Sequence, residues 1–130
     1  MPTGIERITA ERQRQIDTEG WTPEHDDKHA RGELAIAASC YASPEPIKAK
    51  RHFPPQCNCR SVGECSHLFG KSRWVDPWPW AEKWDKRSRH SRLRQLEIAG
   101  ALIAAEIDRL LRLEKGLSSS TAEKLDGGEA

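Results

Sequence analysis

The fold is decided by one stretch near the carboxyl end, residues 90–115, which reads HSRLRQLEIAGALIAAEIDRLLRLEK. Apolar residues recur in it every three or four positions, which is the spacing of one face of an α-helix. That face consists of Leu93, Leu96, Ala99, Gly100, Ile103, Ile107, Leu110 and Leu113. The pattern predicts one long amphipathic helix over residues 90–115. A stripe this long on a chain this small also makes a homodimer a reasonable expectation.

Two shorter helices are expected before it. Residues 5–19 combine three isoleucines with many Glu, Arg and Gln, which favours a helix lying on the surface and ending at Gly20. Thr22-Pro23-Glu24 is typical of a new helix start, with a hydroxyl cap and a proline in the first turn. From about residue 29, apolar residues at helical spacing, most of them alanine, predict a second helix. They are Ala30, Leu34, Ala37, Ala38 and Tyr41.

Length and composition limit what the chain can be. It has 130 residues, 36% hydrophobic and 32% charged, so we expect a single domain with a small core. The net charge of +1 gives no overall attraction to nucleic acid or to an anionic membrane. No run of apolar residues is long enough to span a membrane, and no signal-peptide pattern is present. Both observations favour a cytoplasmic protein. We predict a mainly α, small single domain of about three helices over residues 1–116, followed by a disordered tail over residues 117–130.

An irregular segment, residues 43–75, interrupts the helical pattern with prolines and cysteines. It contains four potential zinc ligands, Cys57, Cys59, Cys65 and His67. Three thiolates and an imidazole fill a tetrahedral site and leave no position for water, so the spacing predicts a structural zinc ion. His52 is an alternative ligand, and a reduced loop without metal or a redox function are the other interpretations. Cys40 lies outside this cluster and is expected in the core.

Tryptophan and proline dominate the next segment. Four of the five tryptophans lie within residues 74–84, and Pro77 and Pro79 exclude a regular helix in its first half. These tryptophans are Trp74, Trp78, Trp80 and Trp84. They are expected either to close the helices as a hydrophobic plug or to offer flat surfaces to a nucleobase.

Polar residues crowd around the start of the second helix. They are Glu24, His25, Asp26, Asp27, His29 and Glu33. Helix capping and a solvated acidic face explain such a cluster, and so does a site for a divalent cation or a polar ligand. Glu106 lies on the stripe of the long helix, so we expect it to be half-buried or paired. Its candidate partners are Arg109, Arg112, His29 and Arg31.

Several strings of residues resemble a family of small proteins of temperate bacteriophages and prophages. The strings are ERQRQI (11–16), EGWTPEHDD (19–27), GELAIAASCYA (32–42), WPW (78–80), AGALI (99–103) and AEIDRL (105–110). The resemblance covers residues 6–42 and 76–112 and implies a phage accessory protein in the host cytoplasm. Residues 43–75 depart from the family pattern as an insertion, and no proline follows Lys86 where the family has one.

Two fainter similarities point to nucleotides. Gly20-Trp21 and Asp76-Pro77-Trp78 are similar to the ryanodine-receptor repeat module, which implies a nucleotide-derived ligand. Gly32-Glu33-Leu34 is similar to the all-helical nucleotide pyrophosphohydrolases, which hold magnesium on paired carboxylates, although the E-x-x-E and E-x-x-D pairs of those enzymes are absent here.

The leading hypothesis is a non-catalytic protein that binds a small nucleotide-like ligand, such as a host defence signal. The predicted ligand-binding residues are Trp21, Asp26, Asp27, His29, Glu33, Trp78, Trp80, Glu106 and Arg109. One alternative is a magnesium-dependent nucleotide pyrophosphohydrolase that uses the same carboxylates. The other is a zinc-stapled interaction protein that inhibits a host protein or binds nucleic acid through basic residues near the cysteines. Those residues are Lys48, Lys50, Arg51, Arg60, Lys71 and Arg73, together with their neighbours His52 and Phe53.

Overall fold

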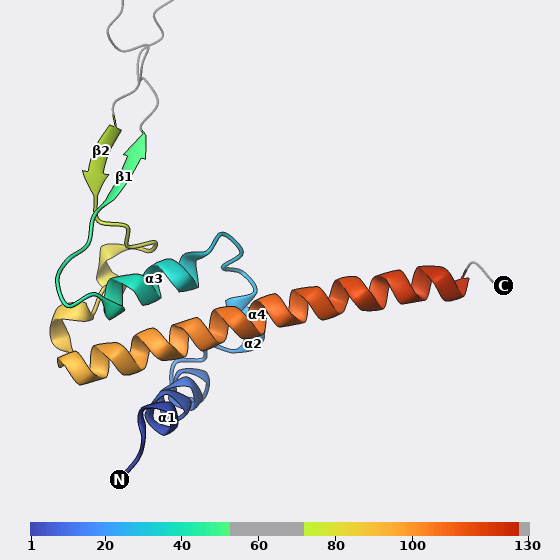
Figure 1. Cartoon of the computed structure of the whole chain (residues 1–130), viewed down its shortest axis with the longest axis horizontal. Coiled ribbons are helices and arrows are strands. Elements are labelled where there is room, and N and C mark those ends of the chain that lie inside the picture. The colour runs from blue at the N-terminus through green and yellow to red at the C-terminus, as the bar shows by residue number, and fades with distance from the viewer. Residues whose placement is uncertain (53–71, 128–130) are drawn as a thin grey trace, which may run out of the picture. The chain divides into compact units, whose positions relative to one another are not determined.

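The computed structural model describes residues 1–52 and 72–127, and it is mainly α-helical (Figure 1). The chain divides into two compact units. Residues 1–44 and 78–130 form a helical unit, and residues 45–77 form the second. The four predicted zinc ligands, Cys57, Cys59, Cys65 and His67, lie outside the described residues. In the part that is described, no helix has both the length and the apolarity needed to cross a membrane.

Helix α1 (Gly4–Asp17) begins where the Thr3 hydroxyl accepts a hydrogen bond from the Glu6 backbone N–H at 3.3 Å. The sequence predicts a helix lying on the surface, and most side chains of α1 are exposed or partly exposed. Glu11 and Gln15 are buried, whereas Ile5 is 78% exposed. The helix therefore packs partly through polar side chains, since Arg94 donates to the buried Glu11, and partly through Ile8, which lies over Gly100.

The predicted helix start at Thr22 is confirmed, but the helix that follows is short. α2 (Pro23–Asp26) has Pro23 in its first turn, and the Thr22 hydroxyl accepts from the His25 N–H at 3.3 Å. The predicted second helix begins later than residue 29, as α3 (Glu33–Ala42). Gly32 delays it because it adopts a left-handed conformation, with φ of +82°, that ends the preceding turn.

Helix α4 (Arg92–Gly127) is the longest element and extends past residue 115, where the sequence predicts its end (Figure 1). Residues 117–127, predicted as part of a tail, belong to this helix. No proline occurs in this stretch, and the Gly127-Gly128 pair is its first strong stop signal.

The face that α4 buries differs from the prediction. Its buried apolar residues are Ile98, Ala99, Ala101, Leu102 and Ala105. Larger side chains of the predicted stripe are instead 43–55% exposed, and these are Leu93, Leu96, Ile103, Ile107, Leu110 and Leu113. Alanines on α4 meet Ala37 and Ala38 of α3, and small side chains let two helix axes approach closely. Close packing thus selects the alanine face rather than the leucine face.

The core of the helical unit is formed between α3 and α4. It contains Leu34, Ala37, Ala38, Tyr41, Ile98, Ala99, Leu102 and Ala105. Trp21, Trp78 and Trp80 pack against it while remaining partly exposed. The tryptophan segment is not a regular helix, as its prolines predict, and it continues into the 3-10 turns η1 (Glu82–Trp84) and η2 (Arg87–Arg89).

The second unit contains an antiparallel pair of strands that the sequence pattern does not reveal. β1 (Ala49–His52) pairs with β2 (Ser72–Val75). Lys50 lies opposite Trp74, and Arg51 lies opposite Arg73. Each strand has four residues, which is too short for a period of two to stand out.

Candidate functional site

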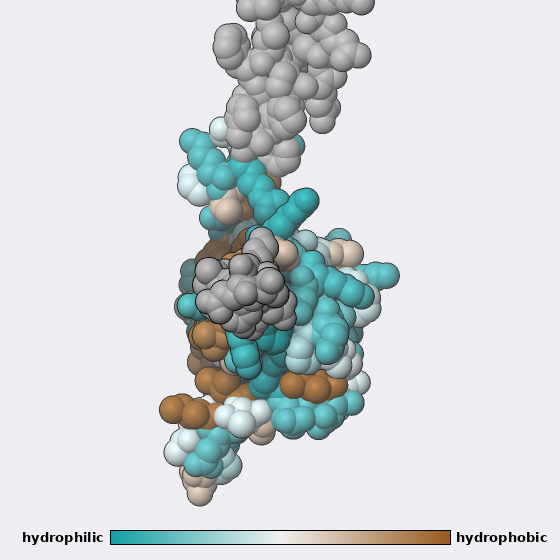
Figure 2. Space-filling model, turned by 90° about the vertical axis from the view of Figure 1, so that its right-hand side faces the viewer, coloured by the Kyte–Doolittle hydropathy of each residue, from teal (hydrophilic) through white to brown (hydrophobic). Residues whose placement is uncertain are grey.

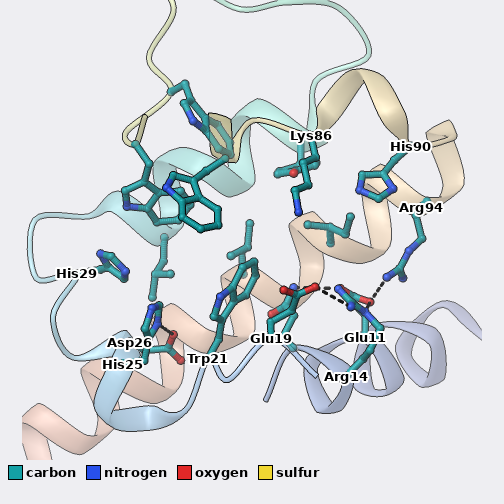
Figure 3. A pocket seen from close by; sticks show the side chains of 18 of the residues that line it. Glu11, Arg14, Glu19, Trp21, His25, Asp26, His29, Lys86, His90 and Arg94 are labelled. Atoms are coloured by element: carbon teal, nitrogen blue, oxygen red, sulfur yellow. Dashed lines mark hydrogen bonds and ion pairs between the residues drawn. The ribbon is translucent and has the colours of Figure 1, made fainter. Parts of the chain in front are cut away.

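A cavity of about 580 Å³ opens in the helical unit (Figure 3). It is lined by side chains from α1, α2, α3, α4 and the tryptophan segment. The lining residues are Glu11, Arg14, Gln15, Glu19, Trp21, His25, Asp26, His29, Leu34, Tyr41, Trp78, Trp80, Ala81, Trp84, Lys86, His90, Arg94, Ile98 and Leu102. The volume falls within the range of about 300–1,000 Å³ that is usual for sites of small ligands.

Aromatic rings form one wall of the cavity, which we call the aromatic wall. Trp21 stacks on His25 with ring centroids 6.5 Å apart and an interplanar angle of 11°. The rings of His29 and His25 are T-shaped with centroids 5.2 Å apart, and the ring of His29 is tilted against Trp80 with centroids 5.1 Å apart. The rings continue through Trp78, 5.4 Å from Trp80, to Tyr41, 5.9 Å from Trp78. Residues distant in sequence thus form one continuous series of aromatic rings.

Charged side chains form the opposite wall, which we call the ionic wall (Figure 3). At its centre is Glu11, which is only 2% exposed and accepts hydrogen bonds from Arg14, at 2.9 and 3.0 Å, and from Arg94. Gln15 donates to the same carboxylate at 3.2 Å. Arg14 also pairs with Glu19 at 3.0 Å. These contacts tie α1 to the amino-terminal part of α4.

The ionic wall stays charged near neutral pH. Burial by itself would raise the pKa of Glu11, but hydrogen bonds from Arg14 and Arg94 outweigh it and hold the pKa below its ordinary value. The hydrogen bond to Glu11 raises the pKa of Arg14 in turn. Burial, followed by the nearby charge of Arg94, lowers the pKa of His90. His90 is therefore biased toward its neutral form beside the permanent cations.

Lys86 completes the ionic wall as an exposed cation. Within residues 1–52 and 72–127, its ammonium group makes no ion pair with a carboxylate. The charges of Arg14 and Arg94 are largely balanced by Glu11 and Glu19. Lys86 thus supplies the uncompensated positive charge at this end of the cavity.

Three cavity-lining side chains carry a buried polar atom for which the described residues supply no hydrogen-bond partner. These atoms are Gln15 Oε1, His25 Nδ1 and Trp80 Nε1. The Asp26 carboxylate lies 3.8 Å from His25 Nδ1. A buried polar group without a partner costs about 1–3 kcal/mol.

Five of the predicted ligand-binding residues line the cavity. They are Trp21, Asp26, His29, Trp78 and Trp80. Asp26 is 1% exposed and accepts a hydrogen bond of 2.5 Å from Arg12, which also donates to the Trp21 carbonyl at 3.3 Å. The pair with Arg12 indicates that Asp26 holds the aromatic wall in place.

The other four predicted residues do not line the cavity. Glu106 pairs with Arg109 on its own helix at 2.6 Å, one of the pairings expected from the sequence. Asp27 pairs with Arg112 at 2.8 Å. Glu33 lies 3.3 Å from the Nδ1 of His29 and also accepts from the Arg31 N–H. Ion pairing between helices and turns accounts for these carboxylates.

The sequence interpretation missed the ionic wall. Its residues are Glu11, Arg14, Glu19, Lys86, His90 and Arg94. One signal was available in the sequence: the first turn of α4 has no acidic residue, yet it contains Arg92 and Arg94. Cations at a helix amino terminus oppose the helix dipole, so they indicate an acid supplied from elsewhere. Here Glu11 of α1 is that acid.

Metal ligands do not gather at the cavity. In the part of the chain that the structure describes, no group of three or more His, Cys, Asp and Glu side chains could hold a metal ion. The carboxylates predicted to bind magnesium instead pair with arginine or histidine, as described above. The zinc prediction concerns residues outside this part and stays a prediction.

Comparison with known proteins gives no match: no family model, no curated protein and no solved structure is significantly similar to this chain.

Proposed function

We propose that the helical unit binds a small nucleotide-like ligand in its cavity, without turnover. The observation that carries the proposal is the opposition of an aromatic wall to an ionic wall across about 580 Å³. A nucleotide has the same division, with a flat aromatic base at one end and an anionic phosphate at the other. We assign the base to the aromatic wall and the phosphate to the ionic wall.

The aromatic wall suits a base because stacking on tryptophan and histidine does not require a particular base. Such stacking contributes about 1–3 kcal/mol for each base. The rings of Trp21 and Trp80 lie at two points of this wall, joined by His25 and His29. Leu34 of α3 and Leu102 of α4 supply an apolar floor that excludes water.

The ionic wall suits a phosphate because guanidinium and ammonium groups donate several hydrogen bonds to anionic oxygens. Arg14 and Arg94 are held in fixed positions by Glu11, so little entropy is lost when they bind a ligand. Lys86 adds the charge that Glu11 and Glu19 do not offset. Under the resemblance to temperate-phage accessory proteins, the proposal extends to sequestration of a host signalling nucleotide.

The test is a fluorescence titration of the full chain with nucleosides and with their mono-, di- and triphosphates. Four tryptophans line the cavity, so binding should quench their emission. Lys86→Ala should lower the affinity for phosphorylated ligands about tenfold, because a hydrogen bond to a charged group contributes about 1.5–3 kcal/mol. The affinity for nucleosides, which have no phosphate, should not change. Lys28→Ala, which removes an exposed lysine outside the cavity, is the matched control.

Two results would overturn the proposal. The first is the absence of binding by every nucleotide tested. The second is magnesium-dependent release of phosphate or pyrophosphate, which would favour the pyrophosphohydrolase alternative. In that case Glu33→Gln should abolish release, whereas it should leave non-catalytic binding intact because Glu33 lies outside the cavity.

A second candidate function, binding of single-stranded nucleic acid, is favoured by the strand pair of residues 45–77. Trp74 is 66% exposed and lies opposite Lys50, so an aromatic surface and a cation are neighbours on this ribbon. Trp74→Ala should reduce binding of a labelled oligonucleotide at least severalfold. Trp84→Ala, which removes a tryptophan that is 55% exposed in the helical unit, should have no effect on it.

A further inference from the structure

The carboxyl-terminal half of α4 carries a row of exposed apolar side chains, which we call the α4 seam. The seam consists of Ile103, Ile107, Leu110, Leu111 and Leu113, each 48–56% exposed. Leu93 and Leu96 continue the same face toward the amino end of the helix, at 55% and 43% exposure. Figure 2 looks toward the carboxyl end of α4 and shows hydrophobic residues, in brown, beside and below it.

The α4 seam is distinct from the core. The buried residues Ile98, Leu102 and Ala105 lie on the side of α4 that meets α3. A helix that is apolar on two sides has two surfaces to cover, and intramolecular packing covers one of them. Beyond Arg112, every side chain that the structure describes, through residue 117, is exposed. An isolated helical segment of this length is marginal in water, so a partner that covered it would stabilise the end of α4.

The spacing of the seam is that of a coiled coil. Residues 96, 103, 110 and 117 are leucine or isoleucine at intervals of seven, and residues 93 and 107 supply the intervening positions. Alternating intervals of three and four produce the pattern of knobs and holes by which two α-helices pack along their length. Two positions break the series, Gly100, over which Ile8 of α1 packs, and Glu114.

The exposed area matches what self-association requires. Seven leucine and isoleucine side chains, each about half exposed, leave on the order of 600 Å² of apolar surface per chain, the upper end for a monomer's largest patch. Two such surfaces exceed the total of about 1,000 Å² that marks a specific interface.

Charge also favours a second copy of the chain over a charged partner. Within the seam, Leu111 and Leu113 flank the central heptad positions, where heteromeric coiled coils carry pairing charges. The nearby Glu106 is already neutralised by Arg109 at 2.6 Å. A two-fold axis brings identical surfaces together, and this surface has little charge to repel its own copy.

We propose that two copies of this chain associate through the α4 seam, helix against helix. In analytical ultracentrifugation the 130-residue chain should have twice the mass of one chain. Leu110→Lys should convert it to a monomer, since Leu110 lies at the centre of the seam. The side chain of Leu110 is 48% exposed, so lysine is compatible with the fold of the single chain, and circular dichroism checks that the helix content is retained.

Asp108→Lys is the matched control, because it introduces the same residue two positions away on an exposed side of α4 outside the seam. It should leave the dimer intact. Glu114→Leu fills one interruption of the heptad series and should tighten the dimer at least fivefold in a dilution series. A wild-type monomer at all concentrations, a dimer that survives Leu110→Lys, or a dimer lost in Asp108→Lys would each overturn the proposal.

Discussion

Ile8 of α1 packs into the space that Gly100 leaves on α4. A Cβ atom at position 100 would lie 2.5 Å from Cδ1 of Ile8 and 2.7 Å from its Cγ1, well inside van der Waals contact. The glycine therefore has a steric role in the middle of a helix, where it costs about 1 kcal/mol relative to alanine. Close approach of α1 to α4 is what brings Glu11 within reach of Arg94.

Gly100→Ala should destabilise the protein by about 1 kcal/mol in urea unfolding, because the overpacking cost of about 1–3 kcal/mol exceeds the gain in helix propensity. Gly116→Ala is the control on the same helix. No atom lies within 4 Å of a Cβ there, so that variant should be more stable by about 0.5–1 kcal/mol. Equal stabilisation by both variants would show that Ile8 does not occupy this position.

Glu11 should make the protein sensitive to acid. Its pKa is lowered in the folded state, so the stability that its charge contributes is fully present above the unfolded value of 4.5. That stability is lost as pH falls through the folded pKa. Urea unfolding between about pH 6 and pH 3 should show this loss, and Glu11→Gln should show a shallower dependence from a lower starting stability. Glu24→Gln, at an exposed carboxyl, should leave the profile unchanged.

Two neighbouring aspartates, Asp26 and Asp27, should differ sharply in their contribution to the stability of the fold. Asp26 is 1% exposed and pairs with Arg12, so Asp26→Ala should cost about 3–5 kcal/mol by leaving that guanidinium buried without its anion. Asp27 pairs with Arg112 at 2.8 Å, but its side chain is 53% exposed. Asp27→Ala should therefore cost no more than about 1 kcal/mol. Thermal unfolding of the two variants measures the difference, and similar costs would contradict the assignment.

The zinc prediction is tested by metal analysis of the purified full chain. We expect one zinc ion per chain, released by a chelator and lost in Cys57→Ser. Cys40→Ala is the control, because Cys40 is a buried residue of α3 in the helical unit and is not among the predicted ligands. A metal-free wild-type protein, or zinc retained in Cys57→Ser, would show that the cysteine spacing has another explanation.

Local signals in the sequence predicted the helices well. The cap at Thr22 and the break at Pro77 and Pro79 all correspond to features of the structure. These signals are reliable because each depends on a few adjacent residues. The start of α3 was predicted four residues too early because nothing in the helical spacing marks the left-handed conformation of Gly32.

Contacts between distant segments were not predictable in the same way. Glu11 and Arg94 are 83 residues apart, and neither stands out from the many charges around it. The choice of buried face on α4 also depends on a neighbour, since Ala99 and Ala105 become core only because α3 presents Ala37 and Ala38. Hydrophobic periodicity weights leucine above alanine, so it predicted the wrong face.

The arrangement of Tyr41 and Trp78 has a consequence for the history of the chain. The rings of these two residues lie 5.9 Å apart, although 36 residues separate them in sequence. The chain therefore leaves the helical unit before residue 45 and returns to it after residue 77 at neighbouring points. Entry and exit points this close allow a segment to be acquired, exchanged or deleted by recombination without stretching the rest of the chain. Shorter lineages of the same helical unit, joined directly from residue 44 to residue 78, are the expected products of such exchange.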